Sequence, residues 1–223
     1  MTPRKTLSQQ RARSPEDKDL RRTHLIEAAT RLFADADFEA VTIERVARMA
    51  GVAKGTAYIY FASKEALFLE LVRAELTLWL DALTLKLKRL RARQPESAVP
   101  MTIARITAQR PLMCRLLVLL HTVIEPNLDE PSAREFKLFM RSLLTQASGA
   151  IAARIPGLRV EEAETFMLQT HALVIGITQL SNPRSVIVRV MEQDPKLRSM
   201  RIDFEPFLTQ ALSTLVRGTL GKP

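Results

Sequence analysis

The sequence has little of what β-strands, phosphate loops and nucleophilic active sites require. Only seven of its 223 residues are glycine, and no alternation of polar and apolar residues is long enough to predict a strand. The chain contains no glycine-rich phosphate loop and no nucleophile elbow. Leu, Ala, Arg and Glu dominate instead, and this composition predicts an all-α fold.

Residues for thiol and metal chemistry are equally scarce. The single cysteine, Cys114, cannot form an internal disulfide, which fits a reducing compartment. The three histidines, His24, His121 and His171, lie far apart in the sequence and show no metal-ligand spacing. Cys114 and His121 lie two helical turns apart, about 10 Å on one helix, which is too far for a thiolate–imidazole pair. We therefore expect no metal, no cofactor and no enzymatic activity.

Long apolar runs are also missing. No stretch is long enough to span a bilayer, and the N-terminus has no apolar core of the kind found in signal peptides. The most apolar stretch, residues 112–120, is interrupted by Arg115. We expect a cytoplasmic protein without a membrane partner.

Acidic residues are too few to balance the basic ones, so the formal net charge is +9. The excess of Lys and Arg is concentrated in the first 93 residues. A basic surface favours an acidic partner such as nucleic acid, but alone it predicts only adhesion to polyanions. A specific function needs a motif.

The densest pattern in the chain predicts a helix-turn-helix. Thr42 is expected to cap a helix over residues 43–50 by accepting an orphan backbone N–H. Gly51 ends this helix where a left-handed backbone costs least, and a second short helix follows over 54–61. Ser63 is expected to cap a third helix. Two short helices joined by a tight glycine turn are typical of a helix-turn-helix, whose second helix enters the DNA major groove.

The residue types of the second helix suit DNA. Gly55 allows close approach to the base edges, and Thr56 offers a hydroxyl and a methyl group for base contact. Lysine and tyrosine side chains beside them can bind phosphates. An ordinary solvated helical corner is the alternative for any single residue, and the coincidence of cap, turn and basic flanks favours DNA. The predicted DNA contacts are Thr42, Arg45, Lys54, Gly55, Thr56, Tyr58, Tyr60 and Lys64.

This segment resembles the DNA-binding domain of the TetR family of bacterial one-component regulators. The similarity begins at residues 25–29, ends near 65–68, and is most specific in the run GVAKGTAYIYF over residues 51–61. Ala53 stands where the family usually has Ser, which implies that one helix cap is missing here. The resemblance implies an N-terminal three-helix helix-turn-helix domain followed by a larger C-terminal helical domain for ligand binding and dimerisation.

Three segments are expected along the chain: a flexible basic arm over residues 1–20, a TetR-type helix-turn-helix domain over 21–81, and a helical regulatory and dimerisation domain over 82–223. For the arm, two roles stay open: a solubilising tail, or an arm along the minor groove or phosphates. The resemblance implies that the long helix from Lys64 joins the DNA-binding domain (the head) to the regulatory domain (the body). Movement of the far end of this helix would then reorient the head. Helices are predicted over 20–36, 64–93, 98–108, 111–124, 132–155, 160–180, 186–191 and 204–217.

Two late helices, 160–180 and 204–217, carry wide apolar bands that favour a homodimer interface. Two such helices from each protomer can form a four-helix bundle across a two-fold axis. The dimer would then present two recognition helices to a pseudo-palindromic operator. An intramolecular core is the alternative for both bands. The predicted interface residues are Phe166, Leu173, Val174, Ile177, Leu208, Ala211, Leu212 and Leu215.

The middle of the chain is where the resemblance implies a ligand cavity. Its composition indicates an apolar pocket with a few polar groups, typical of sites for small apolar or amphipathic ligands. Ordinary core packing is the alternative for each apolar residue, and a satisfied, partly buried histidine is the alternative for His121 and His171. The predicted lining residues are Trp79, Met113, Cys114, Leu117, His121, Phe136, Met140, Met167 and His171.

These expectations converge on a sequence-specific transcriptional regulator that acts as a dimeric repressor. A small molecule would release it from its operator by binding two conformers unequally. Two other classes stay open: a nonspecific nucleic-acid-binding protein, which would bind random and selected DNA equally, and a helical protein-interaction adaptor, which would bind no DNA at low salt. Activation also stays open, because the fold does not determine the sign of regulation.

Overall fold

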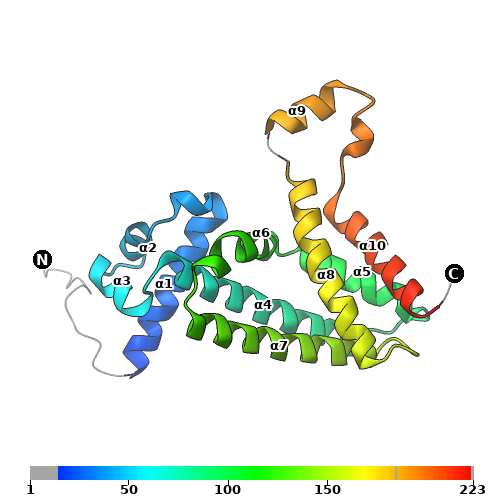
Figure 1. Cartoon of the computed structure of the whole chain (residues 1–223), viewed down its shortest axis with the longest axis horizontal. Coiled ribbons are helices and arrows are strands. Elements are labelled where there is room, and N and C mark those ends of the chain that lie inside the picture. The colour runs from blue at the N-terminus through cyan, green and yellow to red at the C-terminus, as the bar shows by residue number, and fades with distance from the viewer. Residues whose placement is uncertain (1–14, 184, 222–223) are drawn as a thin grey trace, which may run out of the picture. The chain divides into compact units, whose positions relative to one another are not determined.

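A computed structural model describes residues 15–183 and 185–221, and every regular element within these ranges is helical (Figure 1). The all-α prediction is therefore confirmed. Among the same residues, no helix is long and apolar enough to cross a membrane. Residues 1–14 of the expected basic arm lie outside the described residues. Its last part is helical, because α1 (Pro15–Asp35) begins at Pro15 rather than at Leu20, and proline suits a first helical turn.

The chain forms two compact units, and one long helix contributes to both. The first unit comprises the chain up to Ala74 together with Leu120–Leu128, and the second comprises Glu75–Leu119 and the chain from Asp129 onward. Helix α4 (Lys64–Arg89) crosses this division without a break. The domain boundary predicted from the sequence lies between residues 81 and 82, inside the same helix. No proline or glycine of α4 indicates where one unit ends and the other begins.

The first unit is a small helical domain. Its elements are α1, a 3-10 turn Phe38–Ala40, α2 (Ile43–Met49), α3 (Lys54–Tyr60), the start of α4, and the returning segment Leu120–Leu128. Phe68 lies at the centre of its core, with ring centroids 5.0 Å from Phe33 and 4.7 Å from Phe38, both edge to face. Each buried phenylalanine stabilises the unit by about 1.5–3 kcal/mol. This core is the platform on which α2 and α3 are held.

The second unit contains the rest of α4, a 3-10 turn Arg198–Met200, and the helices α5 (Pro95–Ala108), α6 (Pro111–Leu119), α7 (Glu130–Ala152), α8 (Val160–Ser181), α9 (Ser185–Gln193) and α10 (Phe204–Thr219). Helix α8 packs against α6, α7 and α10, and α10 also packs against α5. Asp129 caps α7 by accepting from the Ser132 backbone N–H at 2.7 Å, which lowers the pKa of its carboxyl group. The second unit is thus a helical bundle built around α8.

The helix predicted over 111–124 changes character part of the way along. It is α-helical only to Leu119, continues as a π-helix over Leu120–Ile124, and ends in a 3-10 turn over Glu125–Asn127. Pro126 has no N–H to donate and cannot continue the regular ladder, so the chain departs from α-helical geometry before it. Residues Leu120–Leu128 belong to the first compact unit, and no local sequence pattern predicts this.

Candidate nucleic-acid interface

The turn between α2 and α3 has the geometry that the sequence predicts. The Thr42 hydroxyl accepts from the Arg45 backbone N–H at 3.2 Å, and this caps α2. Gly51 has a φ of 71°, and the Val52 N–H then donates to the Ala47 carbonyl at 3.0 Å, closing the turn. A non-glycine residue in this conformation costs about 1–2 kcal/mol. The predicted Thr42 cap and the glycine turn are therefore confirmed.

The third helix of the motif is also capped as expected, whereas α3 itself is not. The Ser63 hydroxyl accepts from the Ala66 backbone N–H at 3.0 Å at the start of α4. At the start of α3, Ala53 provides no side-chain cap, in agreement with the missing cap inferred from the sequence. The α3 orientation therefore depends on packing, in which the buried Ala57 faces inward.

The outer face of α3 presents a short, mixed polar and apolar surface. Tyr58 is 48% exposed and Ile59 is 81% exposed, while Lys54 and Gly55 are also exposed. Thr56 and Tyr60 are half-buried, so they lie at the edge of this surface. Ile59 is not among the residues predicted to contact DNA, although its position two residues beyond the buried Ala57 could have indicated its exposure. An exposed isoleucine on this helix suits contact with a thymine methyl group.

The cations around α3 differ in their availability. The Lys54 ammonium lies 3.6 Å from a Glu44 carboxylate oxygen, and the Arg48 guanidinium lies 3.9 Å from the other oxygen of Glu44. Such exposed pairs contribute at most about 1 kcal/mol and exchange readily for phosphate. Arg45, by contrast, donates from its guanidinium to the Ala40 carbonyl.

Lys64 has a structural role that sequence reasoning missed. Its ammonium donates to the Phe38 carbonyl and lies 3.6 Å from the centroid of the Phe38 ring. Burial lowers the pKa of this lysine, while the negative charges of Glu39 and Glu65 oppose the shift. Lys64 thus stabilises the junction between α4 and the turn Phe38–Ala40. Contact with a DNA phosphate would require breaking these contacts.

An ion pair that was not predicted from the sequence joins α1 to α4. The Arg22 guanidinium lies 2.6 Å from a Glu70 carboxylate oxygen and 5.5 Å from the centroid of the Phe61 ring. Phe61 directly follows α3, so Arg22 contacts both α4 and the end of α3. Arg22 therefore links α1, the start of α4 and the residue that ends α3 within the first unit.

The predicted ligand-pocket residues do not all belong to one unit. His121 is exposed in the first unit, with Nδ1 3.0 Å from Glu125 Oε2. The others belong to the second unit, where Met140 and His171 are half-buried and the remainder are buried: Trp79, Met113, Cys114, Leu117, Phe136 and Met167. An open groove on the second unit is lined by different residues: Ala92, Arg93, Gln94, Ser97, Ala98, Met101, Thr209 and Ser213.

Most predicted dimer residues lie in the core of the second unit. Phe166, Val174, Ile177, Leu208 and Leu212 are buried, because α8 and α10 pack against one another and against neighbouring helices. Leu173, Ala211 and Leu215 are only half-buried. The large apolar side chains that these helices expose are instead Val160, Leu168, Leu180 and Phe207. For the buried positions, the structure favours the intramolecular alternative.

A capped helix, a left-handed glycine and a short exposed second helix on a three-helix core together define a helix-turn-helix protein of the DNA-binding class. The particular family follows from two family models. A model described as "Bacterial regulatory proteins, tetR family" matches residues 25–71, and one described as "Tetracyclin repressor-like, C-terminal domain" matches residues 73–223. The chain belongs to the TetR family.

Curated relatives are similar to this chain in sequence over about a quarter of its length. Solved structures are similar to it in fold over most of its length. YhgD of Bacillus subtilis strain 168, named an uncharacterised HTH-type transcriptional regulator, is 43% identical over 51 residues, which are 23% of this chain and 27% of YhgD. The chain spans only 17–28% of the length of the curated relatives it matches.

Two solved structures illustrate the likeness in fold. The fatty acid degradation regulator FadR of Bacillus halodurans has a TM-score of 0.57 at 14% identity and covers 88% of this chain and 97% of its own. FadR of Bacillus subtilis, solved in complex with stearoyl-CoA, has a TM-score of 0.52 at 16% identity over 87% of this chain and 96% of its own.

Proposed function

We propose that the chain is a sequence-specific transcriptional regulator that binds an operator through α3 and acts as a dimeric repressor. The observation that carries this proposal is the exposed face of α3, on which Tyr58 and Ile59 stand beside Lys54 on a capped helix-turn-helix. A recognition helix combines cations for phosphates with small or apolar groups for base edges.

Phosphate contacts would come first from Lys54 and Arg48. Both cations are exposed and share the single carboxylate of Glu44, so a phosphate can replace that carboxylate at little cost. Base contacts would come from Ile59 and Thr56, since Gly55 lets the helix approach the base edges closely. Tyr58 would donate its phenol to phosphate.

The dimer would form through faces of α8 and α10 that the protomer leaves uncovered. Residues 165–181 of α8 contain no Asp, Glu, Lys or Arg, yet Leu168 and Leu180 are exposed there, and Phe207 is exposed on α10. A surface depleted of charge and rich in apolar side chains is typical of the centre of a homodimer interface. A two-fold dimer would bind an inverted repeat.

The effector would be a small apolar or amphipathic molecule bound in the second unit. The supporting observation is the large apolar content of its interior, including Trp79, Met113, Leu117 and Phe136. A protein of similar fold was solved with stearoyl-CoA, a ligand of the same chemical class. Release from DNA would require the effector to prefer one conformer over the other.

Selection of bound sequences from random duplex DNA by the purified protein tests the proposal. An enriched inverted repeat would support a dimeric sequence-specific regulator and would give the half-site spacing. Binding that follows salt concentration without any enriched sequence would contradict it and favour a nonspecific nucleic-acid-binding protein. No binding at low salt would favour a protein-interaction adaptor.

A further inference from the structure

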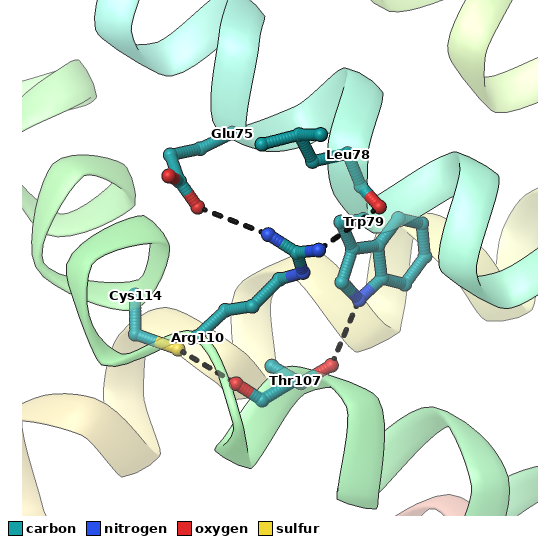
Figure 2. Close-up of polar contacts among 6 residues, drawn as sticks. All are labelled: Glu75, Leu78, Trp79, Thr107, Arg110 and Cys114. Atoms are coloured by element: carbon teal, nitrogen blue, oxygen red, sulfur yellow. Dashed lines mark hydrogen bonds and ion pairs between the residues drawn. The ribbon is translucent and has the colours of Figure 1, made fainter. Parts of the chain in front are cut away.

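Helix α4 is fastened to the corner between α5 and α6 by a set of side-chain contacts within the second unit (Figure 2). Arg110 occupies the corner. Its Nη1 lies 3.4 Å from Oε2 of Glu75, and its Nη2 donates to the carbonyl of Leu78 at 3.2 Å. One guanidinium thus contacts both a side chain and the backbone of the same turn of α4.

A second contact lies beside the first on the same helix. The Trp79 indole Nε1–H donates to the Thr107 hydroxyl at 3.1 Å, and that hydroxyl donates to the Ile103 carbonyl at 2.8 Å. Figure 2 shows Arg110 reaching toward Glu75 and Leu78 of α4, and Trp79 of the same helix reaching toward Thr107. Glu75, Leu78 and Trp79 share one face of α4, since residues three and four apart are neighbours on a helix.

The Trp79–Thr107 contact is buried, and the Arg110–Glu75 pair is less exposed than the other charge pairs cited for the second unit. Trp79 is 4% exposed and Thr107 is 1% exposed, and the side chains of Arg110 and Glu75 are 24% and 17% exposed. Arg141 pairs with Glu164 at 3.3 Å, but its side chain is 65% exposed. A shielded hydrogen bond to a charged group contributes more than an exposed ion pair. The contacts on α4 therefore restrain it, whereas the Arg141 pair adds little.

The position of the contacts gives them a consequence beyond stability. Glu75 is the first residue of α4 that belongs to the second unit, and the preceding turns of α4 belong to the unit that carries α3. We propose that Glu75, Trp79, Thr107 and Arg110 form a clasp whose function is to fix the direction in which α4 leaves the second unit. In a dimer, this direction sets the spacing of the two recognition helices.

This inference rests on the proposed operator-binding dimer, and it concerns how that dimer binds a full repeat rather than a single half-site. Binding to one half-site needs only a folded head. Binding to an inverted repeat needs both heads at the correct spacing at the same time. A loosened clasp populates more directions of α4, so only a fraction of dimers is competent for the full repeat, and apparent affinity falls by that fraction. The clasp residues are positioning residues that touch no DNA.

The test compares duplexes that contain a full inverted repeat or one half-site from the selection experiment. Glu75→Gln keeps the shape of the side chain and removes its charge, and Thr107→Val removes the hydroxyl that Trp79 contacts. We expect each to weaken binding to the full repeat about tenfold and to leave binding to the half-site unchanged. Thr107→Ser and Arg141→Gln are the matched controls and should change neither affinity.

Hydrogen exchange on the same intact variants provides the second measurement. Amides of α4 from Leu76 to Leu83 should exchange faster in Glu75→Gln and in Thr107→Val than in the controls, while amides of α2 should not change. Equal losses on both duplexes, no loss on either, or unchanged exchange in α4 would each overturn the clasp. Failure of the proposed function would appear already in the wild-type protein, as no preference for an inverted repeat.

Discussion

The two compact units both expose apolar side chains, but in different electrostatic surroundings. On α3 of the first unit, Ile59 is 81% exposed and lies on a helix flanked by Lys54. On α8 of the second unit, Leu168 and Leu180 are 60% exposed within a stretch that has no Asp, Glu, Lys or Arg. Apolar groups beside cations fit DNA, where phosphates and thymine methyl groups lie close together. Apolar groups without charges fit another protein surface.

The largest expected effect separates the two units by their cores. Phe68→Ala removes the ring on which Phe33 and Phe38 pack and should destabilise the first unit by about 3–5 kcal/mol. DNA binding should be lost, while the helical content of the second unit remains in circular dichroism.

The matched variant for that experiment is Phe136→Ala, which empties a buried position of the second unit. It should lower stability by a similar amount without removing half-site binding. The comparison between the units would break if Phe68→Ala and Phe136→Ala had the same effect on half-site binding.

The turn of the first unit should respond to a smaller change. Gly51→Ala forces a side chain into a backbone with φ of 71° and should cost about 1–2 kcal/mol of unfolding free energy. No atom of the described residues lies within 4 Å of the added Cβ, so the cost comes from the backbone. Urea denaturation measures it, and Gly55→Ala is the control, because Gly55 lies within α3 at an ordinary helical φ. Equal stability of both variants would contradict the assigned turn.

The cation beside α3 should have a smaller effect that depends on salt. Lys54→Gln removes one phosphate contact, so the slope of log K against log salt should fall by roughly one unit and affinity should fall on all DNA sequences. Arg141→Gln removes an exposed cation from the second unit and should leave the slope unchanged. Fluorescence anisotropy titrations over a range of salt concentrations measure both, and identical slopes would argue against a DNA surface on α3.

The smallest expected effect concerns the single thiol of the second unit. Burial raises the pKa of Cys114 to about 11, so the thiol stays protonated in the folded chain while the unfolded thiol ionises near 9.0. The contribution of Cys114 to stability is therefore present below pH 9 and is lost as pH rises toward 11. Native protein at pH 8 should react slowly with iodoacetamide and denatured protein should react fast. Rapid native labelling would show that the body opens around α6.

Local signals were sufficient for the recognition head. Thr42, Gly51 and Ser63 act on residues at most five positions away, and each does in the structure what its residue type predicts. Even the missing cap at Ala53 followed from the sequence. Helix class and order were predicted for the same reason, since caps, prolines and apolar periodicity are local properties.

Features that depend on distant partners were not predictable. Lys64 contacts Phe38, 26 residues earlier. The prediction that Lys64 binds a phosphate rested on its charge and on its position beside α3, and neither property indicates this packing. The membership of Leu120–Leu128 in the first unit and the burial of Phe166 and Leu208 likewise depend on which helices meet. Wide apolar bands predict burial but do not tell whether the protein's own helices or a partner provide it.

One measurement tests most directly the claim that α3 contacts bases. Selection from random duplex DNA would be repeated with Ile59→Ala and, as its control, Leu168→Ala in the second unit. We predict that Ile59→Ala keeps the inverted repeat and its spacing but loses preference at one position in each half-site, at a cost of about 1 kcal/mol. Leu168→Ala should keep every base preference. An unchanged sequence preference for Ile59→Ala, or a change for Leu168→Ala alone, would contradict the account.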